Sequence, residues 1–279
     1  MIFQSICNLF IAQQLYKMSG SHAIPGTSIG RPTQREDFSH ETATVSLAGE
    51  SYFFSGPARS YGRVHRGMAN QPKLDFDHRT GPDKTAYIIL GPDPHFFQCL
   101  RYTRGSIAAR SKWTECSELE DYGEISDLYT EHDVERPSFL YLGPNKTFYT
   151  RVDDGTEKWE LPHEIVRQAL QVTSDAVRSA VDSLWLGVGD AWVAQYRDSR
   201  FRFDLKGQYA NLEPILRQKQ DQEVSINALA LNVADGKSYV CVFNDGDVVY
   251  KAGSARFDGK ELEAWCEQNF RFTQRLRFE

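Results

Sequence analysis

Two carboxylates and an imidazole stand close together in the segment Leu74-Asp-Phe-Asp-His78, and such a set could bind a metal ion. A Ca²⁺ ion requires about six or more oxygen ligands, and a zinc ion requires about four ligands. The sequence offers no further ligands at matching spacing. We therefore interpret Asp75, Asp77 and His78 as parts of a solvated loop and predict no metal site.

Motifs of nucleophilic, hydrolytic or nucleotide chemistry do not occur in the chain. The sequence has no G-x-S-x-G elbow, no P-loop and no H-E-x-x-H pair, and its 7 histidines are scattered. Gly187-Val-Gly189 is too short for a dinucleotide fingerprint. We predict no catalytic residue and no cofactor. An accessory enzyme of a biosynthetic pathway, with a pocket between structural units, is the least favoured hypothesis.

Two groups of charged residues are candidates for binding a partner. Residues 115–135 contain many acids and no Lys or Arg, and an acidic loop of this kind attracts a basic partner. A solvated surface loop without a partner would have the same composition. Two arginines stand at the same offset in related segments and could line a shared face. The candidate residues are Glu118, Glu120, Asp121, Glu124, Asp127, Arg101 and Arg197.

The pattern of residues 139–170 predicts three short strands followed by a helix. Residues 139–142 are apolar, as in a buried strand, and Gly143-Pro144 favours a tight turn. A second strand is expected at 148–152, and Asp154-Gly155 is typical of a hairpin that leads into a third strand. Leu161-Pro162 opens an apolar helical pattern, because Pro is favoured at the first helical position.

This segment recurs along the chain in altered form. Its apolar residue followed by a turn residue is found at Leu90-Gly91, Leu142-Gly143, Leu186-Gly187 and Leu231-Asn232. The steps between these pairs are 52, 44 and 45 residues. A period of about 45 residues is typical of solenoids and propellers. Helical patterns beginning near Asn211 and Asp258 follow the later copies, so the predicted unit is β-β-β-α.

We therefore predict a mainly β fold with short helices, built of β-β-β-α repeats of about 45 residues in a propeller-like or toroidal arrangement. Residues 1–42 are expected to be a disordered leader, of which 1–17 need not belong to the mature chain because Met18 is an alternative start. Residues 43–279 are expected to form a single repeat domain. Its units are predicted near 44–64, 86–135, 137–181, 182–224 and 225–270.

The end of the chain alternates between apolar and basic residues over 270–278, which predicts an edge strand. We hypothesise that this strand pairs with the first unit and so closes the ring of repeats.

The best copy of the unit resembles the tryptophan-glycine-like repeats of fungal and other microbial proteins. The resemblance covers about residues 86–270. It implies an interaction surface and names no activity. The copy at Leu186 lacks the Pro and the turn Gly, and the copy at Leu231 lacks the Gly after Leu. The motif is carried by Leu142-Gly143-Pro144, Phe148-Tyr149-Thr150-Arg151, Asp154-Gly155, Trp159 and Leu161-Pro162.

Composition limits the partners and the compartment. The net charge of −6 argues against a nucleic-acid partner. The 5 cysteines form no C-x-x-C pair, which favours reduced thiols in a cytoplasmic or nuclear protein. The apolar start of the chain is too short for a membrane span and lacks the positive region of a signal peptide, so secretion is not expected.

The favoured function is non-catalytic interaction or scaffolding with an unknown protein partner. The alternative is a lectin-like propeller that binds a sugar ligand on aromatic faces. A repeated sugar site should repeat its polar contacts, but the residue three positions after the key aromatic is Cys99, Arg151, Gln195 or Val242. We therefore place the repeated aromatics in the core, namely Phe148, Trp159, Trp192 and Phe203.

Overall fold

The computed structural model divides the chain into two units, Met1–Asp37 and Phe38–Glu279. The residues that it describes all belong to the second unit. They are 43–55, 61–63, 84–92, 95–102, 112–116, 122–132, 138–152, 154–170, 181–255, 257–270 and 275–278. The predicted leader, residues 1–42, and the segment with Asp75, Asp77 and His78 lie outside this part.

The described part of the chain is mainly β, in five small sheets whose consecutive strands pair antiparallel, except for the last pair of the chain, which is parallel. The first two sheets contain β1 (Thr44–Ala48), β2 (Ser51–Ser55) and β3 (Tyr61–Arg63), then β4 (Lys84–Leu90), β5 (Phe96–Tyr102) and β6 (Lys112–Cys116). The next two contain β7 (Phe139–Leu142), β8 (Phe148–Arg151) and β9 (Glu157–Glu160), then β10 (Val181–Leu186), β11 (Trp192–Tyr196) and β12 (Phe201–Asp204). The last contains β13 (Ile226–Leu231), β14 (Tyr239–Phe243), β15 (Asp247–Lys251) and β16 (Arg275–Phe278).

Short helices connect or flank these sheets. They are α3 (Gly123–Glu131), α4 (His163–Ile165) with its π-helical continuation η3 (Val166–Leu170), the 3₁₀ turn η4 (Val188–Asp190), α5 (Leu212–Asp221) and α6 (Gly259–Asn269). Asp258 caps α6 by accepting a hydrogen bond from the amide of Lys260 at 2.9 Å. Asn211 occupies the corresponding position of α5, but its side chain makes no capping bond.

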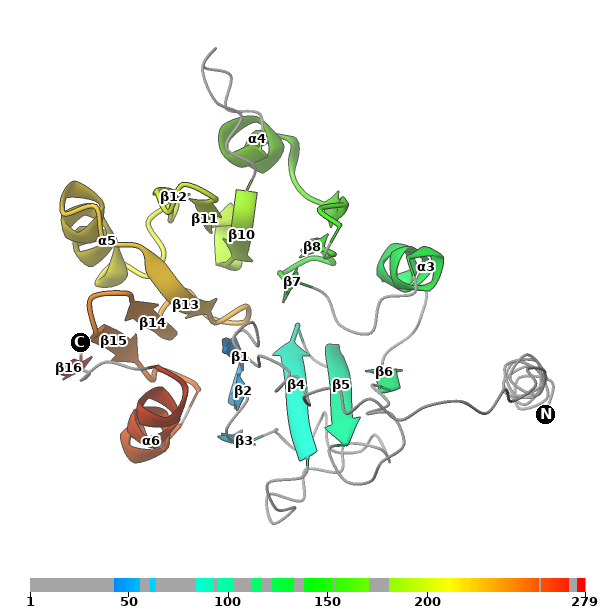
Figure 1. The fold of residues 1–279 in the computed structure, drawn as a ribbon. Coiled ribbons are helices and arrows are strands. Elements are labelled where there is room, and N and C mark those ends of the chain that lie inside the picture. The colour runs from blue at the N-terminus through cyan, green and yellow to red at the C-terminus, as the bar shows by residue number, and fades with distance from the viewer. Residues whose placement is uncertain are drawn as a thin grey trace, which may run out of the picture. The chain divides into compact units, whose positions relative to one another are not determined.

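The first strands of the five sheets lie side by side. β1 contacts β4, β4 contacts β7, β7 contacts β10, β10 contacts β13, and β13 contacts β1 (Figure 1). The second and third strands of each sheet follow outward from this first strand, and α5 and α6 lie beside the outer strands (Figure 1). The sheets therefore meet through their faces and first strands rather than through one continuous hydrogen-bonded sheet.

β14 shows why these strands are apolar on both faces. All five of its residues are buried. Because side chains alternate between the faces of a strand, Tyr239 and Phe243 enter a core shared with β10 and β11. Val240 and Val242 enter a second core, shared with β1, β2 and α6. The central sheet positions are thus covered on both sides by neighbouring units.

Side-chain hydroxyls satisfy the backbone of the first strands where sheets meet. Ser46 donates to the carbonyl oxygen of Ile88 at 3.3 Å, and Ser55 accepts from the amide of Ile88 at 3.2 Å. The Tyr141 hydroxyl donates to the carbonyl oxygen of Leu231 at 2.8 Å and accepts from its amide at 3.0 Å. Burial raises the pKa of Tyr141, so its hydroxyl stays protonated and can make both bonds.

The turn after β13 joins the last sheet to the first. The Asn232 side chain accepts from the Gly49 amide at 2.9 Å and donates to the Gly49 carbonyl at 2.9 Å. It also accepts from the Ala234 amide at 3.0 Å and donates to Ser254 at 3.2 Å. Asn232 is fully buried. One side chain therefore satisfies polar groups of three turns at once.

Helix α6 makes a second link between the last sheet and the first. Trp265 is fully buried, and its indole N–H donates to the carbonyl of Ser55 at 3.0 Å. Glu261 accepts from the Tyr52 hydroxyl at 2.5 Å. Both partners of α6 lie on β2, so the helix that follows the last sheet covers the first.

The hypothesis that the final strand pairs with the first unit is wrong. β16 runs parallel to β15, with Val248 opposite Leu276, and the first sheet consists of β1, β2 and β3. The physical reason is the connection. Helix α6 carries the chain back past the start of β15, and a crossover of this kind produces a parallel neighbour. β16 therefore covers the outer edge of its own sheet.

We expect Asn232→Ala to lower the free energy of unfolding by about 2 to 4 kcal/mol, because it leaves several buried backbone groups without a partner. Asn211→Ala is the matched control. Asn211 is exposed and makes no capping bond, so its loss should cost less than about 0.5 kcal/mol. Urea unfolding followed by circular dichroism measures both. Equal costs for the two variants would contradict the role of Asn232.

Candidate functional site

Part of the acidic segment forms a helix rather than a loop. Glu118, Glu120 and Asp121 lie outside the described residues, whereas Glu124 and Asp127 stand exposed on α3. The other face of α3 is buried in a core with β7 and β8, through Tyr122, Ile125, Leu128 and Tyr129. The prediction of a loop at this segment was wrong for residues 123–131. Apolar residues at helical spacing lie between the acids there, and they form the buried face of α3.

Glu124 has a partner within the chain. It forms an ion pair with Lys158 of β9 at 3.0 Å, and both side chains are largely exposed. His132, just after α3, bonds to Asp154 at 2.8 Å. These contacts dock the helix on the next sheet. Glu124 therefore serves at least in part to hold α3, and the partner-binding role of the segment remains a prediction.

Of the two predicted arginines, only Arg197 has a described side chain, so the shared face that they could line stays a prediction. Arg101 belongs to β5, and its side chain lies outside the description. Arg197 is exposed in the turn between β11 and β12. There it lies close enough to Glu157 to favour the ionised carboxylate.

The prediction for the repeated aromatics holds for some positions and fails for one. Phe148 and Trp192 are buried, and Phe203 is half-buried against the core. Trp159 is 38% exposed, and the prediction that it is core is wrong. Trp159 lies on β9, the outer strand of its sheet, whose residues are mostly exposed.

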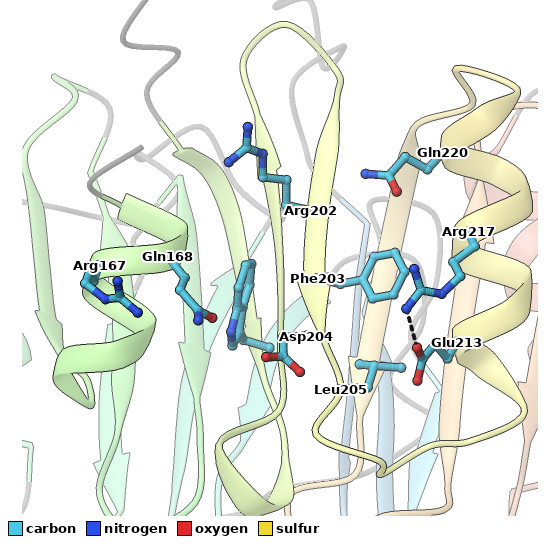
Figure 2. Close-up of a pocket in the computed structure, with 10 residues that line it drawn as sticks. Arg167, Gln168, Arg202, Phe203, Asp204, Leu205, Glu213, Arg217 and Gln220 are labelled. Carbon is cyan, nitrogen blue, oxygen red and sulfur yellow. Dashed lines mark hydrogen bonds and ion pairs between the residues drawn. The ribbon is translucent and has the colours of Figure 1, made fainter. Parts of the chain in front are cut away.

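A groove of about 630 Å³ runs along β12 and is the candidate site (Figure 2). One wall is the helical turn η3, and the other is α5. The floor is the outer strand β12 with its neighbour β11. The lining residues are Arg167 and Gln168 of η3, Trp192 of β11, Arg202, Phe203, Asp204 and Leu205 of and after β12, and Glu213, Arg217 and Gln220 of α5.

The side chains of β12 alternate between the two walls. Phe203 points toward α5, where the Arg217 guanidinium lies 5.6 Å from its ring centroid (Figure 2). Arg202 and Asp204 point to the opposite face, toward η3, as the period of two requires (Figure 2). The α5 wall therefore faces an aromatic side chain of β12, and the η3 wall faces charged side chains of β12.

The free edge of β12 presents backbone groups to the groove. The Tyr196 amide donates to the Arg200 carbonyl at 2.8 Å, which closes the hairpin as a hydrogen-bonded pair. Hydrogen-bonded and non-bonded pairs then alternate along the ladder. The backbone N–H and C=O of Arg202 consequently bond to β11, opposite Ala194. The backbone N–H and C=O groups of Phe201 and Phe203 point away from β11, toward the open edge.

One of these outward groups is covered by α5. The Gln220 side-chain amide donates to the carbonyl oxygen of Phe201 at 2.8 Å. This bond independently supports the outward direction of Phe201. No hydrogen bond to either backbone group of Phe203 is found among the described residues, so both groups are available to solvent or to a ligand in this part of the structure.

Most charges of the groove are paired within the chain. Arg217 bonds to Glu213 at 2.6 Å, and Arg167 bonds to Glu164 at 3.0 Å. Asp204 pairs with Lys206 at 2.7 Å. Burial opposes ionisation of Asp204, but the hydrogen bonds from Lys206 outweigh it and lower the pKa of Asp204.

Arg202 is the exception among the groove charges. Its side chain is exposed, and no carboxylate of the described chain lies within 4.0 Å of its guanidinium. Three arginines and two acids line the groove. Arg202 therefore provides an unneutralised positive charge at the floor.

The arrangement favours binding over acid–base chemistry. Asp204 has a lowered pKa, unlike a general acid, which requires a raised one. Glu157 does have a raised pKa, caused mainly by burial, but it lies outside the groove. Groups of three or more potential metal ligands are not found among the described residues.

No motif in the sequence predicts this groove. Arg167, Gln168 and Gln220 come from two helices on opposite faces of the sheet, and no sequence spacing connects them. One signal was present in Phe201-Arg-Phe-Asp204. Alternating aromatic and charged residues are typical of a strand with one face exposed.

Comparison with known proteins identifies no relative by sequence. No protein family matches the chain, and no curated protein matches it. A solved structure described as "YCF48 bound to D1 peptide" is similar at 10% identity, with a TM-score of 0.25. The match covers 76% of this chain and 66% of that chain, just under two thirds of its length. A superposition at this level does not establish a shared fold.

Among the described residues, no helix is both long enough and apolar enough to cross a membrane.

We expect the Phe203 amide to exchange with deuterium about ten-fold or more faster than the Arg202 amide. The outward Phe203 N–H meets solvent, whereas the Arg202 N–H bonds to β11. Amide exchange resolved by NMR measures both rates. Equal protection would show that another segment covers this edge.

Proposed function

We propose that the protein is a non-catalytic interaction protein, and that the groove along β12 binds an extended peptide segment of a partner protein. The observation that carries the proposal is the free edge at Phe203. Its backbone N–H and C=O point into a groove between two helical walls. An extended peptide can add to such an edge as a further strand, with main-chain hydrogen bonds supplying affinity.

The scaffold of this site is, in this proposal, a small propeller whose five sheets are the blades. The closed cycle of contacts among β1, β4, β7, β10 and β13 supports it. Equivalent turns also support a repeat of the tryptophan-glycine-like kind. Gly155, Ser199 and Gly246 all have positive φ, at 89°, 67° and 94°. The buried free thiols of Cys241 and Cys266 fit a cytoplasmic or nuclear protein.

Sugar binding is less well supported at this groove. Sugars stack on exposed aromatic faces, but Trp192 is only 3% exposed. The other aromatic, Phe203, already lies beneath the Arg217 guanidinium. A sugar would therefore find polar partners without a stacking platform.

We expect the protein to select peptides from a phage library of random nonapeptides, and Phe203→Pro to abolish binding of the selected peptide. Proline has no N–H to donate to an added strand. It is tolerated at edge positions whose N–H faces away from the sheet. Fluorescence anisotropy of the labelled peptide measures affinity, and circular dichroism checks that the variant is folded.

Phe203→Ala is the matched control, because it removes the same ring and keeps the N–H. The Phe203→Ala variant should bind the peptide more tightly than Phe203→Pro, by about ten-fold or more. This difference corresponds to the loss of one main-chain hydrogen bond, which leaves the peptide acceptor desolvated and unpaired. Failure to select any peptide would contradict the proposed function. Equal binding by both folded variants would contradict strand addition at β12.

A further inference from the structure

We infer that the groove selects a peptide with an acidic side chain directly after the residue that pairs with Phe203, so that its carboxylate meets Arg202. This inference rests on the proposed function and adds the chemistry of the partner.

The register follows from the edge of β12. The outward N–H and C=O of Phe203 require that the peptide residue opposite it, here called position 0, forms the hydrogen-bonded pair. Antiparallel addition is the more stable arrangement per residue. It places the following residue, position +1, opposite Arg202, and the preceding residue, position −1, opposite Asp204.

Alternation then assigns each peptide side chain to a wall. Position 0 faces α5 together with Phe203, whose ring lies 6.2 Å from that of Phe201. An apolar side chain extends this aromatic row. Positions +1 and −1 face η3 together with Arg202 and Asp204. Side chains directly opposite each other in adjacent strands are close enough to interact.

Charge distinguishes position +1 from position −1. Arg202 has no carboxylate partner in the described chain, so an acid at +1 supplies it, and the planar guanidinium can bind a carboxylate through two hydrogen bonds. An acid at −1 would face the ionised Asp204. Lys206 already neutralises Asp204 at 2.7 Å, so a base at −1 gains little. The expected pattern is non-acidic, apolar, acidic.

The geometry favours a peptide over a second copy of this chain. β12 is self-complementary, because antiparallel pairing about Phe203 would set Arg202 opposite Asp204 of the other copy. However, α5 reaches over the edge, since Gln220 bonds to the Phe201 carbonyl and Arg217 covers Phe203. A second copy would bring a second α5 to the same face. A lone extended segment brings no helix.

The test uses the full chain and the peptides selected from the nonapeptide phage library. Aligned peptides should show Asp or Glu enriched immediately after a shared apolar residue and depleted immediately before it. The best peptide is then synthesised together with an isomer in which residues +1 and −1 are exchanged. The isomer has the same composition and net charge, and we expect it to bind at least about ten-fold more weakly.

Protein variants supply the second arm. Arg202→Glu should weaken the selected peptide by about ten-fold or more and favour a peptide with Lys at +1. Arg200→Glu is the control, because Arg200 carries the same charge two residues away, is 77% exposed, pairs with Asp198 and does not line the groove. Its affinity should change by no more than about two-fold.

The outcomes separate the inference from the proposed function. If peptides bind and require the Phe203 N–H, but show no acid at +1 or bind Arg202→Glu unchanged, peptide binding stands and the acidic specificity is overturned. If no peptide binds, both fail. If sedimentation shows a dimer that Phe203→Pro abolishes, the groove is an interface between copies, and the peptide inference is overturned.

Discussion

The structure depends on satisfying the backbone of small sheets at the edges where they meet. A sheet of three strands leaves one N–H and C=O row open on its first strand, and such groups are costly when buried. Here side chains of neighbouring units supply the partners. Two serine hydroxyls of the first sheet hydrogen-bond to the backbone of Ile88. The Tyr141 hydroxyl hydrogen-bonds to the backbone of Leu231. Each bond also fixes one sheet against another, so the same groups satisfy the strand edge and set the position of the neighbouring unit.

The outer edges are treated differently from the inner ones. β16 covers the outer edge of the last sheet by forming a further strand. At β12 the cover is incomplete, because Gln220 satisfies the Phe201 carbonyl and leaves the groups of Phe203 facing the groove. An incomplete edge normally carries a risk of aggregation, which charged side chains and flanking helices reduce. The edge at β12 has both features, since it carries the charged Arg202 and Asp204 and lies between two helical walls. The same features shape a site for one extended segment.

Local signals in the sequence explain what could be predicted. The strand at 139–142 is present as β7, and the helical pattern near Asp258 is present as α6, because both depend on neighbouring residues. The pairing of β16 could not be predicted in this way, since it depends on the path of α6. Trp159 was misplaced because its aromatic character did not reveal that β9 is an outer strand. The groove was missed for a related reason: its walls are contributed by helices that meet only after the sheets have packed.

The two walls of the groove are held by different interactions, and this bears on how the groove recognises a ligand. Lys219 anchors α5 to the β14–β15 turn through Asp245 and Asp247, each at 2.5 Å. Burial disfavours the charged lysine, but the two carboxylates outweigh it and raise the pKa of Lys219. The opposite wall is the π-helical turn η3, which continues α4. It is held by the buried Ile165 and Ala169 and by the hydroxyl of Tyr196 in β11, which donates to the Ala169 carbonyl at 3.0 Å. A ligand therefore meets the Phe203 ring with the Arg217 guanidinium over it on the α5 side. On the η3 side it meets the polar side chains of Arg167 and Gln168, which both donate hydrogen bonds to Glu164. Charge recognition at Arg202 fits this side, because the long arginine side chain can rotate to align its guanidinium with a carboxylate without movement of the sheet.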